Sequence, residues 1–308
     1  MLESAPLLQG TSEDCNNLIV GLVSCACWNS HASFGFQKCG FLMILLMIFV
    51  GGGLLFPYLT VLIRSLMPGF LPFISQAGGL PPSSGIFSIF MNVASFFGIV
   101  AFFVLYETIN HRNTKDLKLI RVCNKIGLVV IAISCLGLVV TVANPVGYTD
   151  VPNKFEWVVA VLYQHGIGAI MILVGAAVFQ YILTAIWWFL PDTTKFEKYL
   201  KLSFGVVYFL FFLITVYPMP MFILEELGPN PFDFVSMKNA TYSIPLEYSI
   251  SYKICAFCEW ALVILGAVNF LTHYKDYQRV SLRIVLRHKS CLEETVEPTP
   301  SISLKVIA

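Results

Sequence analysis

The sequence predicts an all-α integral membrane protein with six transmembrane helices and both termini in the cytosol. Of its 308 residues, 57% are apolar and only 12% are charged, which leaves too little polar surface for a soluble domain of this length. Six apolar runs are each roughly 20 residues or longer, the length that crosses a bilayer core of about 30 Å. The Lys and Arg residues also concentrate in alternate loops, as in multipass membrane proteins.

The six runs divide the chain into three parts. They lie at approximately 41–63, 86–106, 126–144, 157–187, 202–224 and 255–272. We therefore expect a cytosolic N-terminal segment (1–40), a six-helix transmembrane domain (41–285) and a disordered cytosolic tail (286–308). The first run contains Gly51-Gly52-Gly53, which is compatible either with a broken helix of the transporter type or with close helix packing.

The orientation follows from the basic residues. With a cytosolic N-terminus, only Arg64, Lys154, Lys238 and Lys253 of the 19 Lys and Arg residues fall on the opposite side. Asn239-Ala240-Thr241 is a sequon for N-glycosylation, and it also falls in a loop on that opposite side. We therefore predict that Asn239 carries a glycan.

Polar residues within the apolar runs are candidate functional residues because each is costly in a bilayer. His165 is either an interhelical hydrogen-bond donor, a proton relay or a metal ligand, and Glu259 is either a structural hydrogen-bond acceptor or a functional acid. Cys255 and Cys258 have the spacing of a redox or metal pair, but this spacing also places both on one helix face. No catalytic motif occurs. We expect no enzymatic activity, no cofactor, no metal and no nucleic-acid partner, and a transporter or channel is a minor hypothesis.

The N-terminal segment contains a candidate sorting signal. In "ESAPLL", Glu3 precedes the pair Leu7-Leu8 by four positions, which resembles the acidic dileucine signal that clathrin adaptors bind. A chance match in a disordered tail is the alternative. If the signal is used, a clathrin adaptor is a partner and the protein resides in endosomes or lysosomes.

The stretch "PFISQAGGLPPSSGIFSIFMN" (72–92) is rich in Pro and Gly between the first two runs, which indicates a folded cap over helix ends. Because Glu259 enters the membrane from the same side, we predict that Glu259 or Trp260 contacts this cap. The stretch resembles the signature of the damage-regulated autophagy modulator family, which includes the Frag and Sfk-type proteins. The matching residues are Pro72, Phe73, Ile74, Ser75, Gly78, Pro81, Pro82, Phe87 and Asn92.

A second match to this family is "CEWALVILGAVNFLTHYKDYQRVSLRI" (258–284), so the resemblance covers roughly 41–285. It implies a multipass protein of lysosomes or related membranes that modulates autophagy and, in some members, cell death. Other branches act at the plasma membrane by recruiting a phosphatidylinositol 4-kinase complex, and a distant branch remodels lipid anchors. Gln76 and Gly166 replace residues that are often acidic in the family, which disfavours cation binding or proton transfer. We expect action through membrane lipids and unidentified protein partners.

Overall fold

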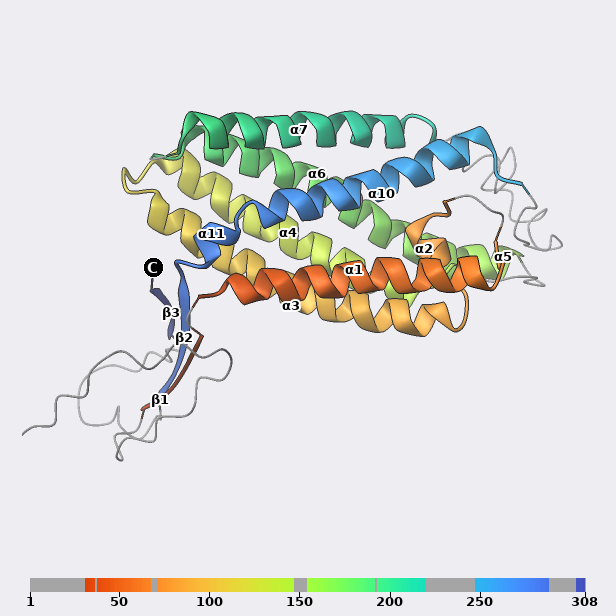
Figure 1. Ribbon diagram of the computed structural model, residues 1–308, viewed down its shortest axis with the longest axis horizontal. Helices are drawn as coiled ribbons and strands as arrows, with labels where there is room; N and C mark the ends of the chain where they lie inside the picture. Colours follow the sequence, from red (N-terminus) through yellow and green to blue (C-terminus); the bar gives the residue numbers. More distant parts are fainter. Residues whose placement is uncertain are drawn as a thin grey trace, which may run out of the picture. The chain divides into compact units, whose positions relative to one another are not determined.

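The computed structural model describes residues 31–36, 38–67, 71–146, 154–191, 193–219, 247–287 and 303–307. Among these residues, six helical segments are long and apolar enough to cross a membrane, which confirms the predicted number of spans (Figure 1). They are α1 (Gly40–Ile63), α3 (Ser83–Arg112), α4 (Lys118–Ala143), the continuous segment α5 (Lys154–Trp157), π-helix η1 (Val158–Leu162) and α6 (Tyr163–Phe189), α7 (Lys195–Val216) and α10 (Ile250–Leu271).

Two short helices lie at opposite ends of the bundle. The first, α2 (Ile74–Ala77), belongs to the Pro- and Gly-rich stretch between α1 and α3, and the second, α11 (Tyr274–Tyr277), follows α10 (Figure 1). We refer to the two ends of the bundle as the α2 end and the α11 end.

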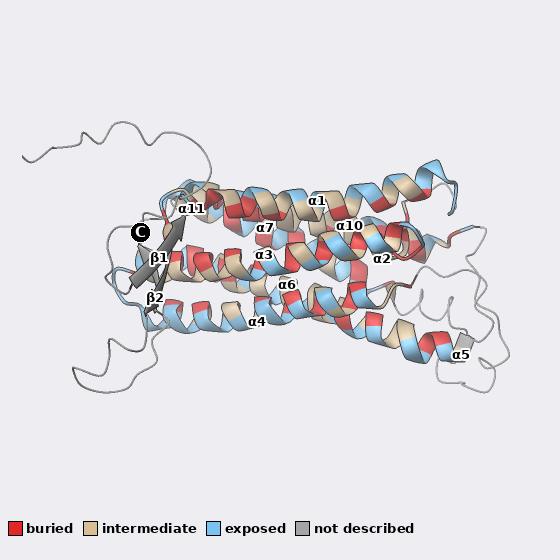
Figure 2. Ribbon diagram, turned by 90° about the horizontal axis from the view of Figure 1, so that it is seen from below, coloured by how far each residue is buried: buried red, intermediate tan, exposed pale blue. Residues whose placement is uncertain are grey.

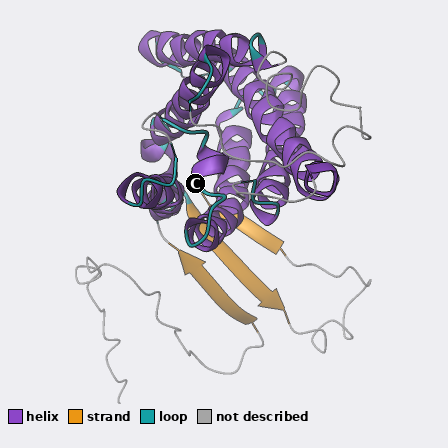
Figure 3. Cartoon of the chain, turned by 90° about the vertical axis from the view of Figure 1, so that its right-hand side faces the viewer, coloured by secondary structure: helices purple, strands orange, loops and turns teal. Residues whose placement is uncertain are grey.

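The chain also contains strands, so the all-α prediction is incomplete. A small sheet of order β1-β2-β3 is made of β1 (His31–Phe36), β2 (Ser281–Arg287) and β3 (Ser303–Ile307), drawn in orange in Figure 3. β1 runs antiparallel to β2, with His31 opposite Arg287 and Phe36 opposite Leu282. Most of the sheet belongs to a compact unit of its own, whereas Ser281, Val306 and Ile307 are grouped with the helix bundle. Residues 281–287 alternate polar and apolar types, a pattern typical of a strand, for most of their length.

The main contacts of the bundle are between long helices that are neighbours in the sequence, and the most extensive of them joins α4 and α6. Buried residues follow one side of each helix, and the outward sides are exposed although they are apolar (Figure 2). Exposed side chains such as Ile63 and Ile89 match lipid, which does not penalise apolar surface.

Glycines bring α4 and α6 close together. A Cβ atom on Gly168 would lie 2.4 Å from Oγ1 of Thr141 and 2.7 Å from the carbonyl oxygen of Gly137. A Cβ atom on Gly137 would in turn lie 2.8 Å from the carbonyl oxygen of Gly168. The two backbones are thus in contact, which is the arrangement that small residues permit in membrane helices.

Helix α1 is continuous through Gly51-Gly52-Gly53, so its glycines do not break it. The positions where Gly52 and Gly53 would carry Cβ atoms are occupied by the side chains of Phe90 and Met91. Of the two interpretations of this triplet, the structure supports close packing of α1 against α3.

Helix α7 begins earlier than the apolar run at 202–224 predicts. Thr194 and Glu197 form a reciprocal capping box that starts the helix at Lys195, and the helix ends at Val216. A hydropathy pattern does not predict this helix start, because the capping box is made of polar residues. As a result Lys201, which the sequence assigns to a cytosolic loop, lies within the helix and is buried.

Candidate functional site

Within the described part of the bundle, a cluster of polar side chains lies at each end. The first fixes the Pro- and Gly-rich stretch at the α2 end. The backbone N–H of Ile74 donates to Oε2 of Glu259 at 2.9 Å, and Nε1 of Trp260 donates to the carbonyl oxygen of Pro72 at 2.9 Å. The sequence predicts that either Glu259 or Trp260 contacts this stretch, and in the structure both residues do. Glu259 therefore serves as a structural acceptor for a loop.

Aromatic side chains from α10 and its flank complete this attachment. The Tyr252 hydroxyl accepts from the backbone N–H of Phe73 at 3.1 Å and donates to Oε1 of Gln76. The Tyr252 ring meets Phe73 edge-on at a centroid distance of 4.8 Å and stacks on Tyr248 at 3.9 Å. A neutral amide at position 76 is thus sufficient to hold the phenol, and no acid is needed there.

The remaining residues of the family signature differ in whether they help to fold the cap. Gly78 lies against Phe87, because a Cβ atom at position 78 would be 2.4 Å from the Phe87 ring, so the glycine lets the stretch fold back on the start of α3. Ser75 is half-buried, whereas Pro81 and Pro82 are exposed and joined by a cis peptide bond. Asn92 is not part of the cluster, since its amide donates to the Ser88 carbonyl oxygen of the same helix at 2.8 Å.

His165 joins α6 to the C-terminal end of α4. Its Nδ1 lies 3.1 Å from the carbonyl oxygen of Thr141 and 2.8 Å from that of Asn144, which assigns the proton to Nδ1. The interhelical-donor interpretation of this histidine is therefore the one that the geometry supports. Within the described part of the chain, no three His, Cys, Asp or Glu side chains are grouped so as to hold a metal ion.

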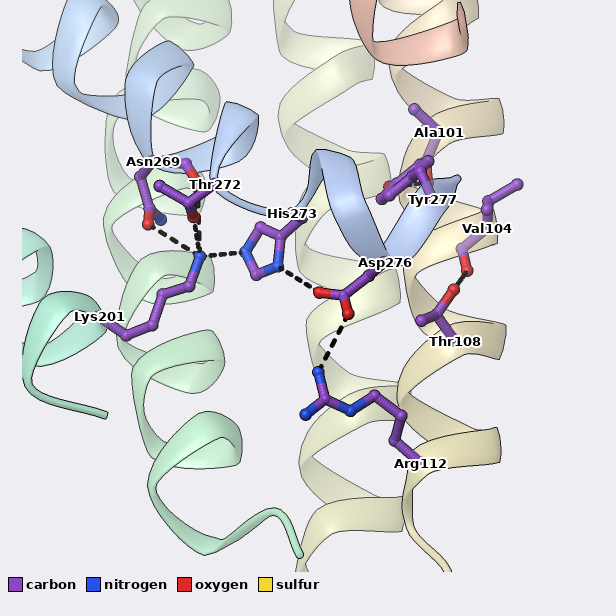
Figure 4. Close-up of polar contacts among 10 residues, drawn as sticks. All are labelled: Ala101, Val104, Thr108, Arg112, Lys201, Asn269, Thr272, His273, Asp276 and Tyr277. Carbon is purple, nitrogen blue, oxygen red and sulfur yellow. Dashed lines mark hydrogen bonds and ion pairs between the residues drawn. The ribbon is translucent and has the colours of Figure 1, made fainter. Parts of the chain in front are cut away.

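The second cluster, at the α11 end, was not predicted (Figure 4). Its central group is the ammonium of Lys201, whose residue is only 3% exposed. Nζ lies 2.6 Å from Nε2 of His273 and 3.3 Å from Oδ1 of Asn269, and it also donates to Oγ1 of Thr272. Lys201 comes from α7, and its three partners are at the C-terminal end of α10.

A carboxylate and a second cation continue this cluster towards α3. Nδ1 of His273 lies 3.9 Å from Oδ2 of Asp276, longer than a hydrogen bond, and Nη1 of Arg112 lies 3.3 Å from Oδ1 of Asp276. Both cations lie near the indole of Trp187, with the Lys201 ammonium 5.5 Å and the Arg112 guanidinium 5.6 Å from the ring centroid. One indole thus faces two positive charges.

The environment holds His273 neutral. Complete burial, followed by the nearby Lys201 charge, lowers the pKa of His273 to about 4. Burial alone would raise the pKa of Asp276, but His273 and the positive charge of Arg112 lower it overall. A neutral His273 that accepts from Lys201 at Nε2 carries its proton on Nδ1, facing Asp276. Because this Nδ1–H is 3.9 Å from the carboxylate, the hydrogen bonds that start at Lys201 end at His273, and Asp276 acts on the imidazole only through its charge.

Several predicted sites contribute to neither cluster. Cys255 and Cys258 are buried and form no disulfide, and Sγ of Cys255 donates to the Thr215 carbonyl oxygen at 3.7 Å. The candidate sorting residues Glu3, Leu7 and Leu8 and the candidate glycosylation site Asn239 lie outside the described residues.

The fold and its two clusters define the class: a multipass membrane protein made of a six-helix bundle. The model of the Frag1/DRAM/Sfk1/Cwh43P N-terminal domain matches residues 38–280, and the chain belongs to this family. The matched region includes both polar clusters.

Curated relatives match along nearly their whole length. DNA damage-regulated autophagy modulator protein 1 of Xenopus laevis is 25% identical over 251 residues, covering 80% of this chain and 94% of the relative. DNA damage-regulated autophagy modulator protein 2 of Rattus norvegicus is 24% identical over 288 residues, covering 87% and 97%. Human DNA damage-regulated autophagy modulator protein 1 is 24% identical over 245 residues, covering 79% and 93%. No solved structure matches this chain.

Proposed function

We propose that this protein modulates autophagy from the membrane of lysosomes or endosomes, and that it acts through lipids and protein partners without catalysis. The observation that carries the proposal is the match to autophagy modulators over 93% or more of their length. A regulatory role in cell death is the further property that the family resemblance implies.

The hydrogen bonds that the buried polar side chains make within the bundle support a role without catalysis. Glu259 binds a backbone N–H, His165 binds two carbonyl oxygens, and Lys201 binds the end of α10. Each of these side chains stabilises the bundle. We therefore expect Glu259→Gln to change autophagic flux only in proportion to the amount of protein. Loss of flux control at a normal protein level would contradict this and indicate a chemical role.

The proposed orientation places both termini and the α11 end in the cytosol and the α2 end in the lumen. It rests on the distribution of Lys and Arg along the sequence. Glycosidase treatment should increase the gel mobility of the wild-type protein and leave that of Asn239→Gln unchanged. An unshifted wild-type band would refute glycosylation of Asn239.

Endogenous localisation combined with depletion tests the function itself. We expect the protein to coincide with lysosomal or endosomal markers, and we expect depletion to change the lysosome-dependent turnover of an autophagosome-bound reporter. Residence at the plasma membrane, with normal turnover and lowered phosphatidylinositol 4-phosphate, would instead support the kinase-recruiting branch.

The sorting signal is tested separately. Substitution of both Leu7 and Leu8 by Ala should move the protein towards the cell surface, because the adaptor loses its two leucine contacts. The matched control substitutes Thr11 and Ser12, which lie in the same segment outside the motif. Unchanged endosomal or lysosomal staining of the leucine variant would exclude Leu7-Leu8 as the sorting signal.

A further inference from the structure

The C-terminal end of α10 presents a set of acceptors to a single point. Four acceptor atoms within the short stretch 269–273 surround Nζ of Lys201 (Figure 4). They are the backbone oxygen of Asn269 at 3.5 Å, its side-chain Oδ1 at 3.3 Å, Nε2 of His273 at 2.6 Å and the hydroxyl of Thr272. The lysine supplies only its ammonium to this arrangement.

None of these four acceptors carries a formal charge. The backbone carbonyls at a helix C-terminus are the negative end of the helix dipole, which favours a cation. The Trp187 indole adds its electron-rich face 5.5 Å from Nζ. Asp276 lies behind His273 and is paired with Arg112, so it is not a direct partner of Lys201. Glu197 is engaged in the capping box of α7.

Neutral acceptors combined with an aromatic face are the chemistry of a site for a monovalent cation. Divalent Ca²⁺ and Mg²⁺ prefer carboxylate-rich sites with oxygens within about 2.0–2.6 Å. The Asn269 oxygens at 3.3 and 3.5 Å are further away than this. Ammonium groups are, in contrast, attracted to aromatic faces, and a primary ammonium, unlike a quaternary one, can also donate hydrogen bonds to neutral acceptors.

We propose that the end of α10, together with Trp187, is a binding site for a monovalent cation of the ammonium class, and that Lys201 is its tethered occupant. The site belongs to α10, His273 and α6, whereas the occupant belongs to α7. Lys201 therefore attaches α7 to the bundle in the way that a bound ammonium ion would occupy the site formed by α10 and Trp187.

The proposal predicts that a free cation can replace the lysine. Truncation in Lys201→Ala removes the side chain beyond Cβ, which has the composition of propylammonium. The vacated volume and the four acceptors then form a site of matching size. We expect the thermal unfolding midpoint of purified full-length Lys201→Ala to fall by several degrees at neutral pH. Propylammonium should restore most of this loss, ammonium or K⁺ a smaller part, and choline none.

Two controls accompany this measurement at constant ionic strength. The wild-type midpoint should be the same in all four chloride salts, because its site is filled. Lys195→Ala removes an exposed lysine of the same helix and should behave as the wild type. If the Lys201→Ala midpoint is the same in propylammonium as in choline, the proposal is overturned.

A second variant keeps the proposal testable if Lys201→Ala does not fold. Lys201→Met preserves most of the side-chain volume but places an uncharged group against the four acceptors. We expect it to unfold at a lower temperature than the wild type, with no recovery in any of the salts because the site has no free volume. A methionine variant as stable as the wild type would show that Lys201 only fills space, which would overturn the proposal.

Discussion

Acidification should destabilise the bundle through His273. The pKa of this fully buried imidazole is lowered to about 4, whereas an unfolded chain has a His pKa of about 6.5. At a pH between these two values, the His273 imidazole is protonated in the unfolded state and neutral in the folded state. The stabilising contribution of the neutral imidazole is therefore complete above about pH 6.5 and is lost progressively as the pH falls towards 4.

The magnitude follows from the same two values. One pKa unit corresponds to about 1.4 kcal/mol, so the full effect is about 3 kcal/mol, of which roughly 2 kcal/mol is lost between pH 7 and pH 5. The lowered pKa of Asp276 acts in the same direction, but only at a pH below its unfolded value of about 4. Between pH 7 and pH 5, therefore, the effect of His273 on stability is separate from that of Asp276.

The assay is thermal unfolding of the purified protein, followed by tryptophan fluorescence at several pH values in this window. The His273→Gln variant retains an acceptor for Lys201 and cannot be protonated, so its midpoint should vary less with pH than that of the wild type. His111→Gln changes an exposed histidine and should keep the wild-type pH dependence. If His273→Gln keeps the full pH dependence, the reasoning about the buried imidazole is refuted.

Two further substitutions test the packing of the bundle. Trp260→Phe keeps an aromatic side chain but loses the hydrogen bond from Nε1 to the Pro72 carbonyl oxygen, so it should lower the free energy of unfolding by about 1 kcal/mol. Trp188→Phe, at a half-exposed position, should change the free energy of unfolding by less than about 0.5 kcal/mol. Gly168→Ala places a Cβ atom 2.4 Å from Thr141 and should cost about 1–3 kcal/mol in chemical denaturation, whereas Gly166→Ala meets open space and should be neutral or slightly stabilising. Equal effects of Gly168→Ala and Gly166→Ala would contradict the close contact of α4 and α6.

The number of spans and the attachment of the cap were predictable from sequence. Apolar runs report the lipid-facing surface directly, and the predicted topology places Glu259 at the same end of the bundle as the Pro- and Gly-rich stretch. The contact of Trp260 with Pro72 follows from the same constraint. Such predictions succeed because topology alone brings these segments to the same end of the bundle.

The cluster around Lys201 was missed because it depends on two features that hydropathy does not contain. The start of α7 is fixed by a polar capping box, and this places Lys201 inside the helix instead of in a loop. Its partners Trp187 and His273 are distant in sequence and meet only after α6, α7 and α10 pack. The Thr194–Glu197 spacing was the available signal for the helix start.

The strands were missed for a different reason. Residues 281–287 span the predicted border between the transmembrane domain (41–285) and the disordered tail (286–308), so no strand is expected there. Their alternation of apolar and polar types was the signal for a strand. The pairing of β1 with β2 joins segments about 250 residues apart, which local patterns do not reveal.

Helix α10 takes part in both polar clusters. Glu259 and Trp260 hold the cap at one end of the bundle, and Asn269, ten residues further along, holds Lys201 near the other. At a rise of 1.5 Å per residue, these two attachments are separated by about 15 Å along one rigid element. A shift of α10 along its axis would strain both attachments together, so α10 couples the packing of the cap at the α2 end to the attachment of α7 at the α11 end.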